Sequence, residues 1–367
     1  MKNVSTLQVE RCSPLTIEDW SRFDARFGAP TFFARPAWAL ALASVSGDAR
    51  PLPLSLAMSD GSSVIVPFLE SRTRLFGMRT LTGMPLRTYT AFVGSDGTPA
   101  GPQATEAAAR YLLASGGDGV EIVPWPLGHL PAADEADPPM PTTSVIDLAP
   151  GFDACVAAMD GVARRMAGQA RRRGVECRIE SGDAAASTYY AMLAESAVRW
   201  GRNAPTISRD LLAATLRNAG ADAEIWIARC DGQAIAGGIV VYGRLEAFFW
   251  TAAMRAEYGP LRPSNLLNVC MIEHAIQRGS RWFNLGGSEG LPGVKKFKDS
   301  LGARSIAYAV LRKSSARLRA YRRASGALRS LYARGGAKSV TGGEGLGVAN
   351  PLSDSGVGEG VGFAAPE

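Results

Sequence analysis

The pattern of apolar and polar residues predicts both helices and strands in the first 150 residues. Helical patterns cover 16–28, 35–47 and 103–117, and the first of them opens on Thr16 as an N-cap. An Asp60-Gly61 turn between two apolar runs predicts a β-hairpin. A strand is expected at 142–149. Together these elements predict a first lobe of mixed α and β structure.

The pattern predicts a second lobe from residue 151 onward. It begins with a long polar helix over 152–174, whose second half is rich in arginine. Three antiparallel strands are expected within 223–254, and a strand, a short helix and a last strand within 280–311. The remaining helices of this lobe are expected at 185–201, 208–220 and 263–279, and Ser208 is expected to cap the second of them.

The composition of the chain excludes several classes of protein. The chain is 46% hydrophobic and 20% charged, which excludes a wholly disordered protein. No stretch approaches the ~18 uncharged apolar residues of a membrane helix, and the first 30 residues are too charged for a signal peptide. A cytoplasmic protein is therefore expected. Five scattered cysteines and two histidines offer no zinc-ligand spacing, so free thiols and no metal are expected.

Positive charge gathers near the C-terminus. Residues 312–338 contain nine Lys or Arg and no acid, whereas residues 1–311 are close to neutral. A basic amphipathic helix is predicted at 312–334. It could lie on an anionic membrane or on nucleic acid, or it could dock on the body with its basic face in water. Residues 335–367 are rich in Gly and Ser and are expected to form a disordered tail.

Three segments carry a resemblance to a known family. Residues 142–179 end one strand in Asp-Leu, pass through an arginine-rich helix, and reach Gly-Val before the next strand. Residues 258–287 have a Pro-led helix, then Gly and a strand that ends in Gly. Residues 293–304 read GVKKFKDSLGAR, an aromatic-Lys pair followed by Gly. Over residues 10–312 the chain resembles the FemAB-like proteins of the GNAT superfamily.

The resemblance implies a fold and an organisation. The order of elements in the second lobe is that of a GNAT-type acyltransferase core. The expected fold class is α/β (α+β), with tandem GNAT-like lobes at 1–150 and 151–311. Each lobe is expected to hold a mixed, mainly antiparallel sheet flanked by helices. The basic helix and the tail follow these lobes.

The resemblance also places catalytic candidates. A lysine at the position of Lys298 can hold a phosphate of the donor or the charge that develops on the acyl oxygen. Glu289, in the glycine-rich segment 286–293, is a candidate general base. Tyr258 is the third catalytic candidate.

The cofactor-binding candidates lie around the start of the helix at 263–279. In a GNAT fold this helix end receives the donor pyrophosphate through free amides and the helix dipole. Arg262, Ser264 and Asn265 are therefore candidates, with Phe297 beside Lys298. The usual Gln/Arg-x-x-Gly-x-Gly/Ala donor loop is replaced by RAEYGPLRPSN. Acyl-CoA, acetyl-CoA in particular, and aminoacyl-tRNA both stay open as donors.

Aromatic and basic side chains supply candidates for acceptor binding. Trp250 is expected on a central strand, where it can line an acceptor groove or pack in the core. Trp200 and Arg202 end a helix and are further substrate-binding candidates.

Three classes of function follow from the sequence, and the first of them, an enzyme, leaves two donors open. The leading one is an N- or O-acyltransferase that moves an acyl group, in particular acetyl, from acyl-CoA to an envelope or exopolysaccharide precursor. A FemAB-type transferase would instead use aminoacyl-tRNA on a lipid-linked peptidoglycan precursor. A non-catalytic assembly scaffold would need no reaction at Lys298. A nucleic-acid binder would depend on 312–338, which holds only two aromatic residues.

Overall fold

The computed structural model describes residues 7–73, 75–86, 88–115, 117–129, 140–288 and 291–335, with side chains described as far as residue 325. The expected tail lies almost wholly outside these residues. Within them, no helix is both long and apolar enough to cross a membrane. The expected mixed α/β fold, with sheets flanked by helices, is confirmed.

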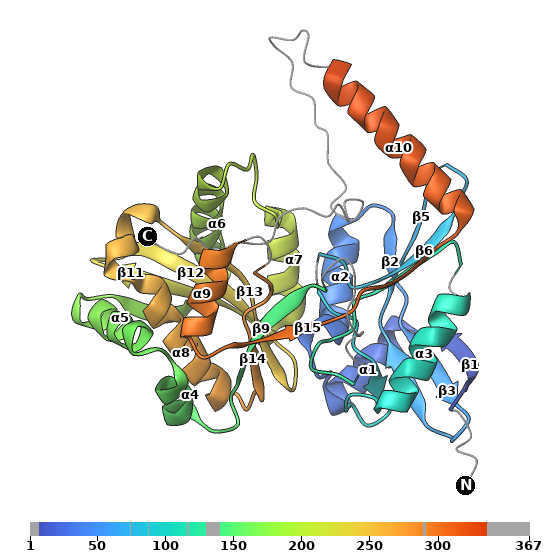
Figure 1. The fold of residues 1–367 in the computed structure, drawn as a ribbon, viewed down its shortest axis with the longest axis horizontal. Coiled ribbons are helices and arrows are strands. Elements are labelled where there is room, and N and C mark those ends of the chain that lie inside the picture. The colour runs from blue at the N-terminus through green and yellow to red at the C-terminus, as the bar shows by residue number, and fades with distance from the viewer. Residues whose placement is uncertain are drawn as a thin grey trace.

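The N-terminal lobe holds two sheets and lies on the right in Figure 1. One sheet has the order β1 (Val9–Pro14), β3 (Leu54–Met58), β4 (Ser63–Val66), β7 (Val93–Gly94). The other has the order β16 (Leu311–Ser314), β8 (Gly119–Ile122), β6 (Arg79–Gly83), β5 (Leu69–Arg72), β2 (Ala49–Pro51). The lobe's helices are α1 (Ile17–Phe27), α2 (Pro36–Val45) and α3 (Pro102–Ser115). Helix α3 contacts strands of both sheets.

The C-terminal lobe is built on one seven-stranded sheet. Its order is β10 (Glu176–Glu180), β11 (Ala223–Cys230), β12 (Gln233–Tyr242), β13 (Glu246–Met254), β14 (Trp282–Asn284), β9 (Thr142–Asp147), β15 (Arg304–Ala307). Its helices are α4 (Phe152–Ala158), α5 (Gly161–Arg172), α6 (Gly182–Arg199), α7 (Arg209–Ala219), α8 (Pro263–Gln277) and α9 (Pro292–Ser300). Helices α6 and α7 cover one face of the sheet, and α5 and α8 cover the other.

Local signals and the structure agree at several elements. Thr16 accepts a hydrogen bond from the backbone of Asp19, and Ser208 caps α7 in the same way. Strands β3 and β4 form the expected hairpin around Asp60-Gly61. The helix expected at 152–174 is instead two helices, because Met159 adopts an extended backbone and Asp160 begins a new N-terminus.

Near the lobe boundaries that the sequence predicts, each lobe's segment contributes one strand to a sheet of the other lobe. Strand β9 precedes residue 150, yet it pairs with β14 and β15 in the C-terminal sheet. Strand β16 follows the C-terminal lobe but pairs with β8 in the N-terminal one. From there the basic helix α10 (Ala316–Gly335) rises away from both lobes (Figure 1).

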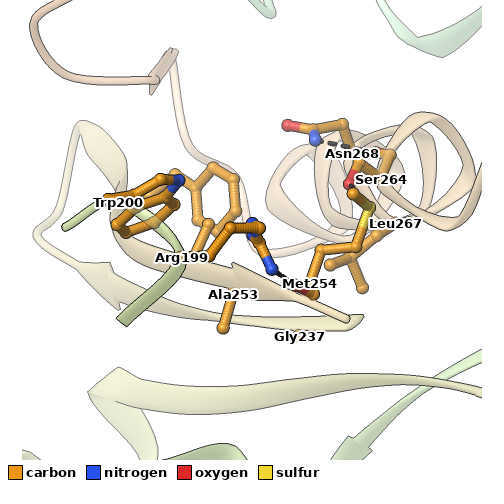
Figure 2. Close-up of a pocket in the computed structure, with 10 residues that line it drawn as sticks. Arg199, Trp200, Gly237, Ala253, Met254, Ser264, Leu267 and Asn268 are labelled. Atoms are coloured by element: carbon orange, nitrogen blue, oxygen red, sulfur yellow. Dashed lines mark hydrogen bonds between the residues drawn. The ribbon is translucent and has the colours of Figure 1, made fainter. Parts of the chain in front are cut away.

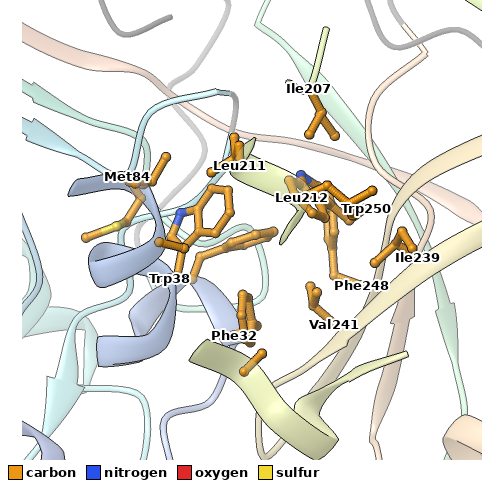
Figure 3. Close-up of a cluster of buried hydrophobic side chains, with 14 of the residues drawn as sticks. Phe32, Trp38, Met84, Ile207, Leu211, Leu212, Ile239, Val241, Phe248 and Trp250 are labelled. Atoms are coloured by element: carbon orange, nitrogen blue, oxygen red, sulfur yellow. The ribbon is translucent and has the colours of Figure 1, made fainter. Parts of the chain in front are cut away.

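An apolar core joins the lobes. Helix α2 packs on α7, and the Trp38 and Trp250 rings meet edge to face at 5.4 Å between centroids. Phe33 and Phe248 make a similar contact at 4.8 Å. Figure 3 shows side chains from α2, α7, β12 and β13 gathered in this cluster. The lobes are therefore packed as one body.

Strand β13 separates from its neighbour part of the way along its length. Its parallel pairing with β14 runs only from Glu246 to Phe248. Its antiparallel pairing with β12 continues to Met254, with a bulge at Trp250. From Phe249 onward one edge of β13 thus diverges from β14. The candidate site lies beside this divergence.

Candidate active site

A cleft lies along the diverging edge of β13, between the end of α6 and the start of α8 (Figure 2). It is lined by Arg199, Trp200, Gly237, Phe249, Ala252, Ala253, Met254, Ser264, Leu267 and Asn268. The floor is apolar, and the polar groups come from the two helix ends. An apolar lining with a few polar groups is typical of ligand-binding sites.

Side chains from α6 satisfy the backbone at the end of β13. Arg199 Nη1 donates to the Met254 carbonyl at 2.9 Å. Ser196 Oγ lies 3.3 Å from that carbonyl and 3.4 Å from the Met254 amide. The Arg199 guanidinium also lies over the Trp200 ring, 5.7 Å from its centroid. This wall of the cleft is therefore fixed by contacts within the protein.

The first turn of α8 forms the opposite wall. Arg262 precedes the helix in a left-handed backbone conformation (φ 58°), and Pro263 starts it. Ser264 Oγ donates to Met254 Sδ at 3.4 Å. The positive end of the helix dipole therefore faces the mouth of the cleft.

Asn268 is the polar side chain at the base of this wall. It is fully buried, and its Nδ2 donates to the Ser264 carbonyl at 2.9 Å. Its Oδ1 accepts no hydrogen bond from any described residue. A buried acceptor without a partner is costly, so it marks a place where a ligand N–H or O–H group would be stabilised.

Lys298 lies in α9 but does not face solvent. Its side chain is 1% exposed, and Nζ donates to the carbonyls of Gly286 at 3.0 Å and Gly287 at 2.6 Å. The ammonium therefore fixes the loop that follows β14, on the far side of the strand divergence. Sequence reasoning expected this lysine to meet a ligand directly; that role stays a prediction.

A buried polar network reaches the same loop from the N-terminal lobe. Thr31 donates to Glu246 at 2.5 Å, and Asn284 donates to the second carboxylate oxygen at 2.7 Å. Asn284 in turn accepts from Thr143 at 2.6 Å and from the Gly286 amide at 2.9 Å. Burial raises the pKa of the Glu246 carboxyl, against the lowering effect of these hydrogen bonds.

The structure brings two of the predicted site residues into the cleft, Trp200 and Ser264. Asn265 lies at the same helix end but is buried, with its amide bonded to the Arg262 carbonyl. Phe297 packs against the core of the C-terminal lobe.

Other predicted residues lie away from the cleft lining. Trp250 belongs to the core between the lobes, which is the packing alternative for that residue. The Tyr258 hydroxyl donates to Gln233 at the start of β12. Arg202 bonds Thr206 within the loop between α6 and α7. Glu289 lies outside the described residues.

Sequence reasoning missed Arg199, Asn268, Glu246 and Asn284. A weak signal existed for Asn268, because it is a polar residue within the apolar run of α8. Glu246 and Asn284 come together only through the pairing of β13 with β14, which the sequence does not display. Among the described residues, no group of three potential ligands could hold a metal ion.

Comparison with known proteins agrees with this geometry. Residues 160–299 match the family described as "Acetyltransferase (GNAT) domain". The matched residues include those that line the cleft, strands β13 and β14 where they diverge, and Lys298. No curated protein matches the chain.

Solved structures share the fold across both lobes. FemX superimposes with a TM-score of 0.62 at 11% identity, over 82% of this chain and 96% of its own. A conserved protein of unknown function from Bacteroides thetaiotaomicron VPI-5482 gives 0.52 at 9% identity, over 83% and 99% of the two chains. Residues 160–299 thus match a GNAT acetyltransferase domain, and the fold of the chain across both lobes is similar to that of FemX.

Proposed function

We propose that this protein transfers an acyl group from acyl-CoA to an amine or hydroxyl of a cell-envelope or exopolysaccharide precursor. The observation that carries the proposal is the diverging edge of β13 beside the start of α8, within the stretch that matches a GNAT domain. The acceptor class rests on the resemblance to FemAB-like proteins.

The cleft has the chemistry that an acyl-CoA donor requires. Bound acyl-CoA supplies an acyl carbon activated as a thioester. Its arm carries amide groups, which the edge of β13 and the free Asn268 Oδ1 can pair. Its phosphates suit the first turn of α8, where Arg262 adds a positive charge. The residues present therefore fit this donor.

Among the possible contributions to catalysis, the described residues best support the positioning of the reacting groups. Lys298 fixes the loop at Gly286 and Gly287, which flanks the strand divergence. A loop held in this way keeps its groups in one orientation during the reaction. Tyr258 and Glu289 remain the proposed proton-transfer groups. Trp200 remains the proposed acceptor contact, since its ring lines the cleft.

One observation favours a second donor. The stretch before α8 is a 3₁₀ helix (Ala256–Leu261) in place of the usual Gln/Arg-x-x-Gly-x-Gly/Ala loop. The backbone amides of Tyr258 and Arg262 donate to carbonyls of the protein itself, so they are not free to bind a donor pyrophosphate. The FemX fold also extends over both lobes. Aminoacyl-tRNA acting on a lipid-linked precursor is therefore the alternative.

Calorimetric titration separates these donors. Purified protein is titrated with acetyl-CoA, free CoA and longer acyl-CoAs, and each result is compared with that for an unrelated nucleotide. The proposal predicts micromolar binding of an acyl-CoA and, in its presence, acyl transfer to amino-sugar or glycan acceptors. Absence of binding to every CoA compound would contradict it, and charged tRNA would become the donor to test.

A further inference from the structure

An exposed apolar pair stands at the tip of the hairpin between β5 and β6. Leu75 is 64% exposed and Phe76 is 73% exposed. They are the only adjacent pair of large exposed hydrophobic residues in the described part of the chain. Phe76 also has a positive φ of 74°, which is unfavourable for a bulky side chain. An exposed apolar pair and a strained backbone each lower stability. Their occurrence at one place indicates that this tip serves a purpose other than stabilising the fold.

The base of α10 is fixed beside this tip. Ser315 caps the helix through the Leu318 amide at 3.1 Å and bonds Asp118 at 3.2 Å. Leu318 is 1% exposed and packs so closely on Gly119 that a Cβ there would lie 2.6 Å from it. The first turn of α10 is therefore docked on the N-terminal lobe. Beyond it the helix rises from the body (Figure 1).

The hairpin tip and the helix touch one another. The rings of Phe76 and Tyr321 lie 6.3 Å apart in an edge-to-face arrangement. We call Leu75, Phe76 and Tyr321, with the arginines of α10, the tip–helix surface. Its described arginines are Arg317, Arg319, Arg322 and Arg323, and all four are exposed.

Acidic groups do not cancel this charge. Residues 312–338 contain no Asp or Glu. The nearby Glu70 is buried, and its carboxylate is already paired with Arg50 and Arg79. Arg72, at the end of β5, is 63% exposed and also lies 3.9 Å from the Glu70 carboxylate. Apolar side chains at a tip surrounded by arginines form the arrangement that binds an anionic lipid surface.

We propose that the tip–helix surface docks the protein on an anionic lipid bilayer. Leu75 and Phe76 enter the boundary between headgroups and acyl chains, and the arginines bind the anionic headgroups. A nucleic-acid backbone would use the arginines equally well, but it offers no apolar layer for Leu75. The proposal does not depend on which reaction the cleft performs.

Vesicle co-sedimentation tests the proposal with the full chain. The vesicles contain equal parts of phosphatidylglycerol and phosphatidylcholine, and pure phosphatidylcholine vesicles serve as the neutral comparison. We expect binding to the anionic vesicles alone, with affinity that falls as salt rises. The double substitution Leu75→Ser/Phe76→Ser should weaken it at least fivefold, by the loss of about 1 kcal/mol or more of apolar insertion.

Matched variants isolate each contribution. Val162→Ser/Ile179→Ser removes two exposed apolar side chains elsewhere and should leave binding unchanged. Arg322→Gln/Arg323→Gln should weaken binding about fivefold per arginine, whereas Arg165→Gln/Arg172→Gln on α5 should not. All these positions are exposed, and equal melting temperatures will show that each variant is folded.

Two results would overturn the proposal. One is a lack of binding to anionic vesicles at low salt. The other is vesicle binding that the tip substitution weakens no more than its control does. Binding of duplex RNA or DNA that competes fully with vesicles, and that ignores the tip substitution, would assign the arginines to nucleic acid instead.

Discussion

At the scale of single residues, the most informative groups are buried polar ones. Glu246 and Asn268 are both 0% exposed, although their residue types usually lie at the surface. Glu246 has its hydrogen-bond partners within the protein, whereas Asn268 Oδ1 has none among the described residues. This difference makes Asn268, and not Glu246, the candidate for a ligand contact in the proposed site.

Glu246 should make stability depend on pH. Its raised pKa means that the folded state binds the proton more tightly than the unfolded state does. Its stabilising contribution is full below the ordinary value of 4.5 and is lost as pH rises through the raised pKa. Glu246→Gln should flatten the free energy of unfolding over this range, as measured by urea denaturation at a series of pH values. An unchanged slope would show that Glu246 does not titrate differently on folding.

Asn268→Leu should weaken donor binding without unfolding the protein. The variant removes the acceptor Oδ1, so acetyl-CoA affinity should fall about tenfold, the worth of one hydrogen bond. Asn218→Leu is the matched control, because Asn218 makes the same bond to the carbonyl four residues earlier, on α7 and outside the cleft. Calorimetry on both variants gives the comparison. Equal effects would remove Asn268 from the site.

At the scale of elements, the sequence predicts what local chemistry decides. Capping at Thr16 and Ser208 and the turn at Asp60-Gly61 were all predicted, because each depends on neighbouring residues. The exchange of β9 and β16 between lobes was not, because it depends on pairing between distant segments. The cleft was missed in part for the same reason, since it exists only where β13 leaves β14.

The short helix α9 should depend on its buried lysine. Lys298→Met removes a charged donor from two carbonyls, which should lower the free energy of unfolding by about 3 kcal/mol. It should also speed amide exchange in 285–288. Lys295→Ala in the same helix breaks only an exposed ion pair with Asp299 and should cost no more than about 0.5 kcal/mol. Similar costs for the two variants would contradict the buried role of Lys298.

At the scale of the whole molecule, two lobes share one core and one polar network. Trp38 of the first lobe packs on Trp250 of the second, and Thr31 of the first lobe bonds Glu246 of the second. Lobes joined in this way are expected to unfold together. The sequence left Trp250 open between an acceptor groove and core packing, and its ring lies in this shared core.

Trp38→Ala should therefore destabilise both lobes at once. The expected loss is about 3–5 kcal/mol, because the substitution leaves a cavity between them. Hydrogen exchange in strands of each lobe should report the same decrease in protection. The control Trp282→Ala alters a half-buried ring within the C-terminal lobe. Loss of protection confined to the N-terminal lobe in Trp38→Ala would show that the lobes are independent.

Blocking the cleft beside β13 shows whether it holds the acyl donor. Ala252 lines the cleft, and Ala252→Trp would fill the space along the strand edge. Ala184→Trp places the same ring on an exposed position of α6. We predict that acetyl-CoA binds the wild type and Ala184→Trp with equal affinity in a calorimetric titration, and that binding to Ala252→Trp is lost. Undiminished binding to a folded Ala252→Trp protein would contradict the account.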